Sequence, residues 1–110
     1  MKKLLDADCD VNCPIARASK VLDGKWMMLV IRDLLSGTKR YSELQRSIIG
    51  ISPRMLAARL ISLEQAGLIS KKIYPTVPPK TEYSLTAAGL RLMPVIKAMA
   101  QFGSSLEPQQ

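Results

Sequence analysis

The sequence contains no histidine among its 110 residues. Histidine is the side chain that most often acts as a general acid or base near neutral pH, so the commonest partner of a catalytic serine or cysteine is missing. The sequence also lacks a glycine-rich phosphate-binding loop and lacks paired carboxylates on an expected helix or strand. We therefore expect a protein that is not an enzyme and that needs no cofactor.

Cysteine is almost as scarce, because only Cys9 and Cys13 are present. Two cysteines without histidine could complete a tetrahedral zinc site within one chain only with the help of carboxylates, so we expect no metal. The aspartates between positions 6 and 10 resemble the start of a calcium loop, but Val11 stands where that loop needs a glycine. We attribute this match to chance.

Long apolar runs are missing too. No run approaches the ~20 residues that a membrane-spanning helix requires, and the start, MKKLLDADCD, is too poor in apolar residues for a signal peptide. We expect a cytoplasmic protein with no membrane partner and with cysteines reduced at rest. The length predicts one domain at 13–103, between a mobile N-terminal segment at 1–12 and a frayed tail at 104–110.

Acidic residues are rare in the middle of the chain. Between positions 39 and 80 there are eight basic and two acidic side chains, which is +6 of the net charge of +7. A surface that binds a polyanion needs such a concentration of positive charge. An inert basic surface is the alternative interpretation.

Helix-start and helix-stop signals divide the first two thirds of the chain. Apolar spacing predicts helices at 14–22, 25–36, 42–48 and 53–66. In the first helix we expect the apolar side chains to be buried; these are Ile15, Ala18, Val21 and Leu22. Ser42 and Ser52 are the expected N-caps of the third and fourth helices.

After Gly67 the helical spacing of apolar residues gives way to a strand-like pattern. LISKKIY and TEYSL are typical of two strands, and the proline-rich PTVPPK between them predicts the stiff tip of a hairpin. Thr86 then caps a helix over 87–102 that Pro94 should kink. The predicted fold is mainly α with a small β-hairpin wing, in the order α-α-α-α-β-β-α.

The third and fourth helices, joined by a tight turn at Gly50, are typical of a helix-turn-helix, which the hairpin makes winged. The second helix of such a pair docks in the DNA major groove. A leucine stripe should hold this helix to the body, which leaves Arg54 and Ala58 opposite the stripe and Arg59 on a flank. The candidate DNA-binding residues are Ser42, Ser52, Pro53, Arg54, Ala57, Ala58, Arg59, Lys71, Lys72 and Lys80.

Other interpretations of these residues stay open. The arginines would also suit an ordinary solvated helix face, and lysine and proline on the hairpin would also protect an edge strand from pairing. A winged-helix module that binds RNA or another protein, without operator specificity, could use the same basic face. Preference for an inverted-repeat duplex would separate these functions.

The segment from Cys13 to about Gly103 resembles the HxlR-type winged-helix transcription regulators, which are relatives of the MarR group. The resemblance is carried by GKW at 24–26, YSEL at 41–44, GIS at 50–52, RLISLEQAGLI at 59–69 and YPTVPPKTEYSLT at 74–86. It implies a DNA-binding regulator, in the first instance a repressor, that forms a homodimer through its first and last helices on an inverted-repeat operator. Ala57 stands where the family often has threonine, and Thr81 where it often has valine.

The last helix also suggests a dimer by itself, because it is apolar over much of its girth. Packing on the first two helices is the alternative. Trp26, Met27 and Met28 could line a pocket for a small-molecule inducer, although such residues more often form core.

Cys13 directly precedes the proline that starts the first helix, where free amides and the helix dipole stabilise a thiolate. It also matches the N-terminal cysteine by which some members of the resembled family sense oxidants, quinones or aldehydes. We therefore expect a redox or electrophile switch at Cys13. A disulfide could join Cys13 to Cys9, could form between these cysteines of two subunits, or could be a mixed disulfide with a small thiol. The alternative is that Cys13 is only a small residue at a helix start.

Overall fold

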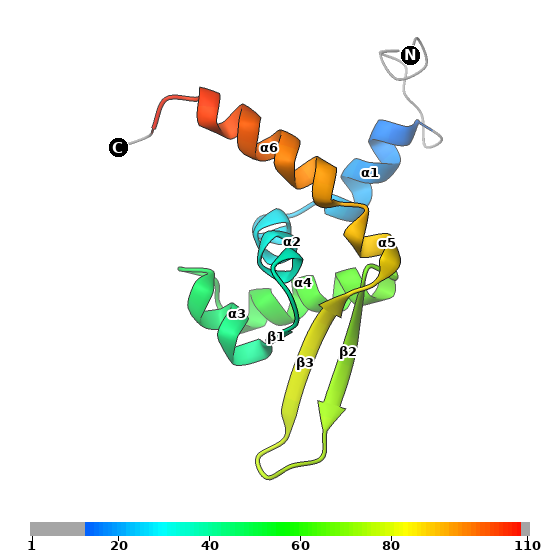
Figure 1. Cartoon of the computed structure of the whole chain (residues 1–110), viewed down its shortest axis with the longest axis vertical. Helices are drawn as coiled ribbons and strands as arrows, with labels where there is room; N and C mark the ends of the chain where they lie inside the picture. Colours follow the sequence, from blue (N-terminus) through cyan, green and yellow to red (C-terminus); the bar gives the residue numbers. More distant parts are fainter. Residues whose placement is uncertain (1–12, 109–110) are drawn as a thin grey trace.

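The computed structural model describes residues 13–108. Its elements, in chain order, are α1 (Pro14–Leu22), α2 (Met27–Leu35), β1 (Lys39–Arg40), α3 (Tyr41–Ser47), α4 (Pro53–Gln65), β2 (Ile69–Tyr74), β3 (Lys80–Leu85), α5 (Ala87–Leu90) and α6 (Met93–Ser105). Figure 1 shows α2, α3 and α4 forming the body, with the β2–β3 hairpin extending from one end and α1 and α6 from the other. Among the described residues, no helix combines the length and the apolar character that a membrane span requires.

The core lies between α2, α3 and α4. Val30, Ile31, Leu44, Leu56 and Leu63 have no exposed side-chain surface at all. Tyr83 of β3 joins the same cluster from the wing, and burial raises the pKa of its hydroxyl, with Glu64 and Tyr41 adding to the effect. The predicted helix-turn-helix and wing are confirmed.

The sheet has one strand more than the sequence predicts. Its order is β1-β3-β2, and both pairings are antiparallel. β1 is only two residues long, Lys39 and Arg40, and pairs with Tyr83 and Glu82. Two charged residues carry no local strand signal, so only their long-range partner makes them a strand.

The prediction that α1 is buried was wrong. None of its residues is buried, and Ile15 and Val21 are 52% and 40% exposed. α1 instead extends away from the body (Figure 1). Apolar periodicity identifies which side of a helix is apolar, but not whether the same chain covers that side.

The predicted kinked C-terminal helix is two helices. α5 ends at Leu90 and α6 begins at Met93, with Pro94 in its first turn, where the missing proline N–H is not needed. The Oγ1 of Thr86 caps α5 by accepting from the N–H of Gly89 (3.1 Å), and it donates to the carbonyl of Gly67 (2.7 Å). A β-carbon at Gly89 would lie 2.1 Å from the carbonyl oxygen of Leu68, so α5 closely approaches the short segment between α4 and β2.

The start of α3 also differs from the prediction. The helix begins at Tyr41, so Ser42 lies inside its first turn and is not the N-cap. The backbone N–H of Arg40 donates to Oε1 of Glu43 at 2.8 Å. The carboxylate of Glu43 thus satisfies the N–H of the N-cap residue, which is a different donor from the first-turn N–H that a serine N-cap would bond.

Candidate nucleic-acid interface

The N-terminus of α4 is held by several local contacts. The Oγ of Ser52 accepts a hydrogen bond from the N–H of Met55 (3.1 Å), which confirms the predicted cap. The hydroxyl of Tyr41 donates to the carbonyl of Pro53 at 2.8 Å, and Gln45 donates to the carbonyl of Ile51. These bonds fix where α4 begins relative to α3.

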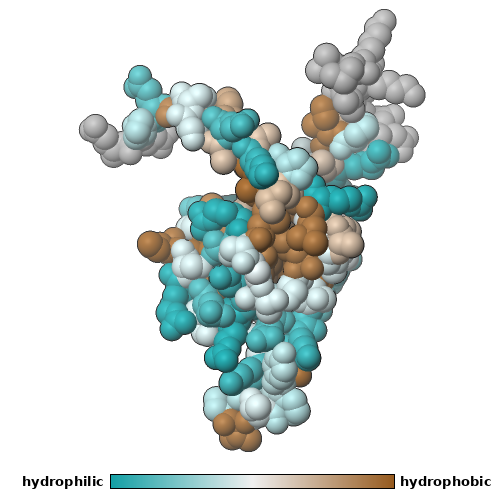
Figure 2. All heavy atoms as spheres, viewed as in Figure 1, coloured by the Kyte–Doolittle hydropathy of each residue, from teal (hydrophilic) through white to brown (hydrophobic). Residues whose placement is uncertain are grey.

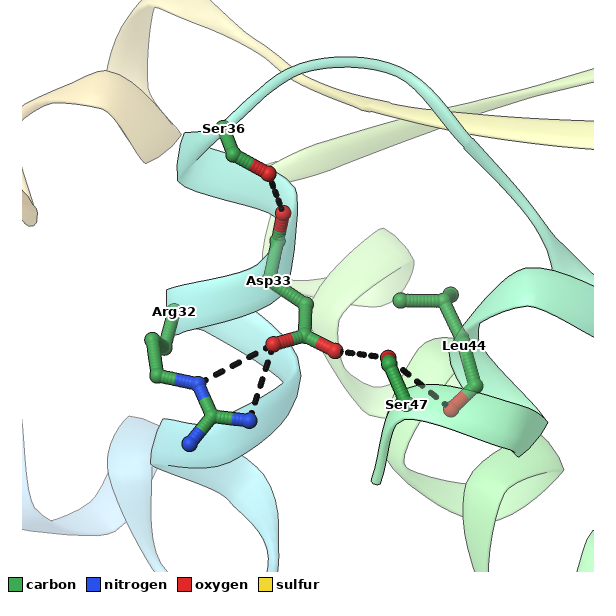
Figure 3. Close-up of polar contacts among 5 residues, drawn as sticks. All are labelled: Arg32, Asp33, Ser36, Leu44 and Ser47. Carbon is green, nitrogen blue, oxygen red and sulfur yellow. Dashed lines mark hydrogen bonds and ion pairs between the residues drawn. The ribbon is translucent and has the colours of Figure 1, made fainter. Parts of the chain in front are cut away.

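A second set of contacts ties α3 to α2. Asp33 of α2 accepts from Nε of Arg32 at 3.0 Å and also accepts from the hydroxyl of Ser47 at the end of α3 (Figure 3). Ser36 donates to the carbonyl of Asp33 at 2.7 Å. Sequence reasoning did not single out Asp33, because nothing local indicates that its partner lies fourteen positions away.

The side of α4 opposite its leucines is open. Leu56, Leu60 and Leu63 are at most 2% exposed, whereas Arg54 and Ala58 are exposed and Ala57 is partly exposed. Ile61 lies on the same outer side and is 53% exposed. Ile61 was not among the predicted site residues, although its position three residues after Ala58 places it on the same side of the helix.

Arg59 does not lie with the outer residues. Its Nη2 donates to Sδ of Met55 at 3.3 Å, and its guanidinium packs on the corner between α1 and α2. A β-carbon at Gly24 would lie 2.3 Å from Nη1 of Arg59, so any larger residue there would displace the guanidinium from its present position. The structure thus separates the two arginines: Arg54 faces outward and Arg59 faces the body of the protein.

The same corner also abuts the turn of the helix-turn-helix. Gly24 has a φ of +109° and Trp26 has a φ of 79°, which is why α2 begins only at Met27. A β-carbon at Gly50 would lie 3.3 Å from the Trp26 ring. The α1–α2 corner therefore contacts both the turn before α4 and α4 itself.

The three predicted lysines of the wing are all exposed but do not share one face. Lys72 pairs with Glu82 and Lys80 with Tyr74, so these four residues lie on one face of the hairpin. The ammonium of Lys72 lies 4.9 Å from the centre of the Tyr74 ring. Lys71 pairs with Tyr83 on the opposite face.

Figure 2 shows hydrophilic surface over much of the lower body and the wing, with apolar patches at the wing tip, at one side of the body and below the terminal helices. This agrees with the concentration of basic residues between positions 39 and 80. No three side chains of histidine, cysteine, aspartate or glutamate lie close enough together to hold a metal ion in the described part of the chain. The arrangement of α3, α4 and wing is suited to binding a polyanion.

Residues 21–110 match the model of the HxlR-like helix-turn-helix family. This chain belongs to that family. An HTH-type transcriptional regulator of Synechocystis is 42% identical over 98 residues, which are 89% of this chain and 73% of that protein. YkvN, an HTH-type transcriptional regulator of Bacillus subtilis, is 41% identical over 99 residues, which are 90% of this chain and 84% of that protein.

Solved structures of transcription regulators share the fold. A MarR-family regulator from Porphyromonas gingivalis W83 has a TM-score of 0.88 and 41% identity, covering 93% of this chain and all of that one. The redox regulator HypR in its oxidized form has a TM-score of 0.81 and 36% identity, covering 88% of this chain and all of that one. The protein is a transcription regulator with a helix-turn-helix DNA-binding domain, and not an enzyme.

In this HxlR-like chain Cys13 is buried, at 7% exposure, and is the residue that precedes α1. Its carbonyl accepts a hydrogen bond from the N–H of Arg17 at 2.9 Å. Cys13 is disulfide-bonded, which differs from our expectation of reduced cysteines. Composition suggests a compartment, but it does not determine the oxidation state of one sulfur. Cys9, like the rest of the N-terminal segment 1–12, lies outside the described residues.

The terminal helices of this HxlR-like chain present apolar surface to solvent. One hollow is lined by residues of α1, by Met28 and by Met99 of α6. A second apolar surface runs along α6 through Val95, Met99 and Phe102, of which Phe102 is 68% exposed. Of the three residues predicted as a candidate inducer pocket, Met27 is buried in the core and Trp26 packs against it. Met28 packs against the core and also lines the first hollow.

Proposed function

We propose that this HxlR-like regulator binds an inverted-repeat operator as a homodimer and represses transcription there. The observation that carries the proposal is the outer side of α4, where Arg54, Ala57 and Ala58 face away from the buried leucines. The N-terminal end of such a helix enters the major groove, and its first residues meet the base edges. Arg54 can donate two hydrogen bonds to a guanine or hold a phosphate.

Phosphate contacts would come from both ends of this surface. Ser52, Pro53 and the free amides at the start of α4 can meet one phosphate, and Ser42, exposed in the first turn of α3, can meet another. On the wing, Lys72 and Lys80 share a face and would act together, whereas Lys71 would need a different phosphate. Arg59 supports α4 from the side of the body and leaves the groove to Arg54.

The homodimer is supported by the terminal helices. Neither α1 nor α6 buries a single residue, although both carry large apolar side chains. A second copy of the chain would cover these surfaces, and two-fold symmetry would then place two copies of α4 on successive major grooves. An operator in the form of an inverted repeat follows from this symmetry.

The thiol switch is supported by the position of Cys13. It is buried at the entry of α1, which carries one of the exposed apolar surfaces. A change in its bonding by an oxidant or electrophile would alter the direction in which α1 extends from the body. That direction would set the distance between the two α4 helices of the dimer. The similar structures of HypR and YodB, named a redox regulator and a transcriptional regulator, are consistent with this proposal.

The DNA contact is tested with duplexes selected from a random library by the wild-type protein. Affinity should fall steeply between about 50 and 200 mM salt, because several phosphates are neutralised. Arg54→Ala should weaken binding by roughly tenfold or more, whereas Arg91→Ala, which removes the same charge at the α5–α6 junction, should not. Equal affinity of Arg54→Ala and the wild type would contradict the proposed orientation of α4, and a preference for hairpin RNA would support an RNA-binding module.

The switch is tested with the same duplex before and after a mild disulfide-forming oxidant such as diamide. Wild-type affinity should differ between the reduced and oxidised protein. Cys13→Ser should bind with one affinity under both conditions. If Cys13→Ser still responds like the wild type, Cys13 is not the switch.

A further inference from the structure

The outer side of α4 carries a strip of apolar side chains directly after its arginine. Ile61 lies four residues after Ala57 and three after Ala58, so its side chain neighbours both alanines on the helix surface. Ala58 is exposed and Ile61 is 53% exposed, so the strip is open. Arg54 lies one turn before it on the same side of the helix.

None of these three side chains can donate or accept a hydrogen bond. The backbone around them cannot do so either, because it is bonded within α4. A base edge with donors or acceptors pressed against the strip would lose its water without any replacement, and an unpaired polar group costs free energy when it is dehydrated. The only apolar group on a base edge in the major groove is the 5-methyl of thymine.

We propose that Ala57, Ala58 and Ile61 select thymine by contact with its 5-methyl group. Each half-site should then carry one or two thymines beside the base or phosphate that Arg54 contacts. This assignment rests on the proposed function, and it names the base chemistry that α4 recognises. Ile61 supplies most of the contact area, because the alanines offer one methyl group each.

A protein partner would be the other way to cover an exposed apolar strip. Three small or medium side chains cover far less than the ~800 Å² that each side of a stable protein interface buries. The surroundings are also basic: Arg54 is on the strip's own side of α4, and the wing beside it carries exposed lysines. Charge complementarity therefore favours a nucleic acid, whose own apolar groups are few and defined.

The test removes single methyl groups from the DNA. Duplexes selected by the wild-type protein are made with 2′-deoxyuridine in place of each thymine in turn, which changes the 5-methyl group and nothing else. We expect one or two positions in each half-site to lose roughly fourfold in affinity, which is the effect of burying one methyl group. Uridine outside the half-sites should leave affinity unchanged.

Two protein variants assign the contact to α4. In Ile61→Ala the loss caused by uridine at those positions should shrink to less than half of its wild-type value. In Ile73→Ala, which makes the same change at an exposed isoleucine of the wing, the loss should be the same as in the wild type. Thermal unfolding of both variants should match the wild type, because both side chains are exposed.

The outcomes separate this inference from the proposed function. If no duplex is selected at all, the proposed function fails. If duplexes are selected and bound but uridine has no effect at any thymine, the operator is bound and thymine selection by α4 is wrong. A uridine effect that persists in full in Ile61→Ala would also overturn the assignment, because the methyl group would then be contacted elsewhere.

Discussion

The body and the terminal helices have similar amphipathic sequences but differ in how much of their apolar surface is buried. In α2, α3 and α4 most of the apolar side chains pack against one another, and several have no exposed surface, although Ile61 on the outer side of α4 is 53% exposed. In α1 and α6 no residue is buried, and Phe102 is 68% exposed. The body therefore buries its own apolar core, whereas the terminal helices leave their apolar side chains exposed.

The two regions meet at one corner. Gly24 and Trp26, between α1 and α2, contact Arg59 of α4 and Gly50 of the turn. Elsewhere in the body, the hydrogen bond between Asp33 and Ser47 links α2 to α3 beside the shared apolar core (Figure 3). A change in the direction of α1 would move this corner first. Substitutions at the corner can therefore test whether the terminal helices influence the position of α4.

The largest effect is expected in the body. Leu56→Ala should lower the free energy of unfolding by about 2–5 kcal/mol, because it leaves a cavity in a fully buried site. Ile15→Ala, at an isoleucine of α1 that is 52% exposed, should cost much less. Urea unfolding at one fixed protein concentration measures both, and equal losses would remove the distinction between the two regions.

The next effect concerns self-association through α6. Phe102→Glu should weaken the dimer by roughly 2 kcal/mol or more, because a charge would replace an aromatic side chain at the proposed interface. Gln101→Glu adds the same charge at the neighbouring position and should have a smaller effect. Sedimentation equilibrium measures both, and a Phe102→Glu protein that associates like the wild type would show that this surface is not the interface.

A smaller effect is expected at the corner. Gly24→Ala places a β-carbon against the Arg59 guanidinium at a φ of +109°, and Gly37→Ala meets nothing at a φ of +135°. Both should lose about 1–2 kcal/mol of stability through backbone strain. Only Gly24→Ala should also reduce duplex affinity. In an Arg59→Ala background, Gly24→Ala and Gly37→Ala should bind the duplex with the same affinity. Equal affinity of the two glycine variants would mean that the corner does not position α4.

The smallest effect is expected at the start of α4. Ser52→Ala removes the hydrogen bond to the N–H of Met55 and should cost about 1 kcal/mol of stability. Ser42→Ala, inside the first turn of α3, should cost less, because Glu43 already bonds the N–H of Arg40. Thermal unfolding compares the two, and a larger loss at Ser42 would reverse our assignment of the caps.

Helix boundaries near strong local signals were predictable. Ser52, Pro53 and Gly67 bracket α4 as expected, and its leucine spacing correctly identified the buried side. The outward position of Arg54 followed from the same spacing at about 100° per residue. The inward position of Arg59 did not, because it depends on the space that Gly24 leaves in another element.

The sequence by itself determined the elements whose signals are local: caps, glycine stops, apolar spacing and the concentration of positive charge. Only the tertiary structure decided that Lys39 and Arg40 form a strand, that α5 and α6 are separate, and that α1 lies uncovered. The physical reason is that local signals act within a few residues along the chain. Whether a helix face is buried and whether a strand finds a partner depend on residues that are distant in sequence. For α1 and α6 we expect the covering residues to come from a second copy of the chain.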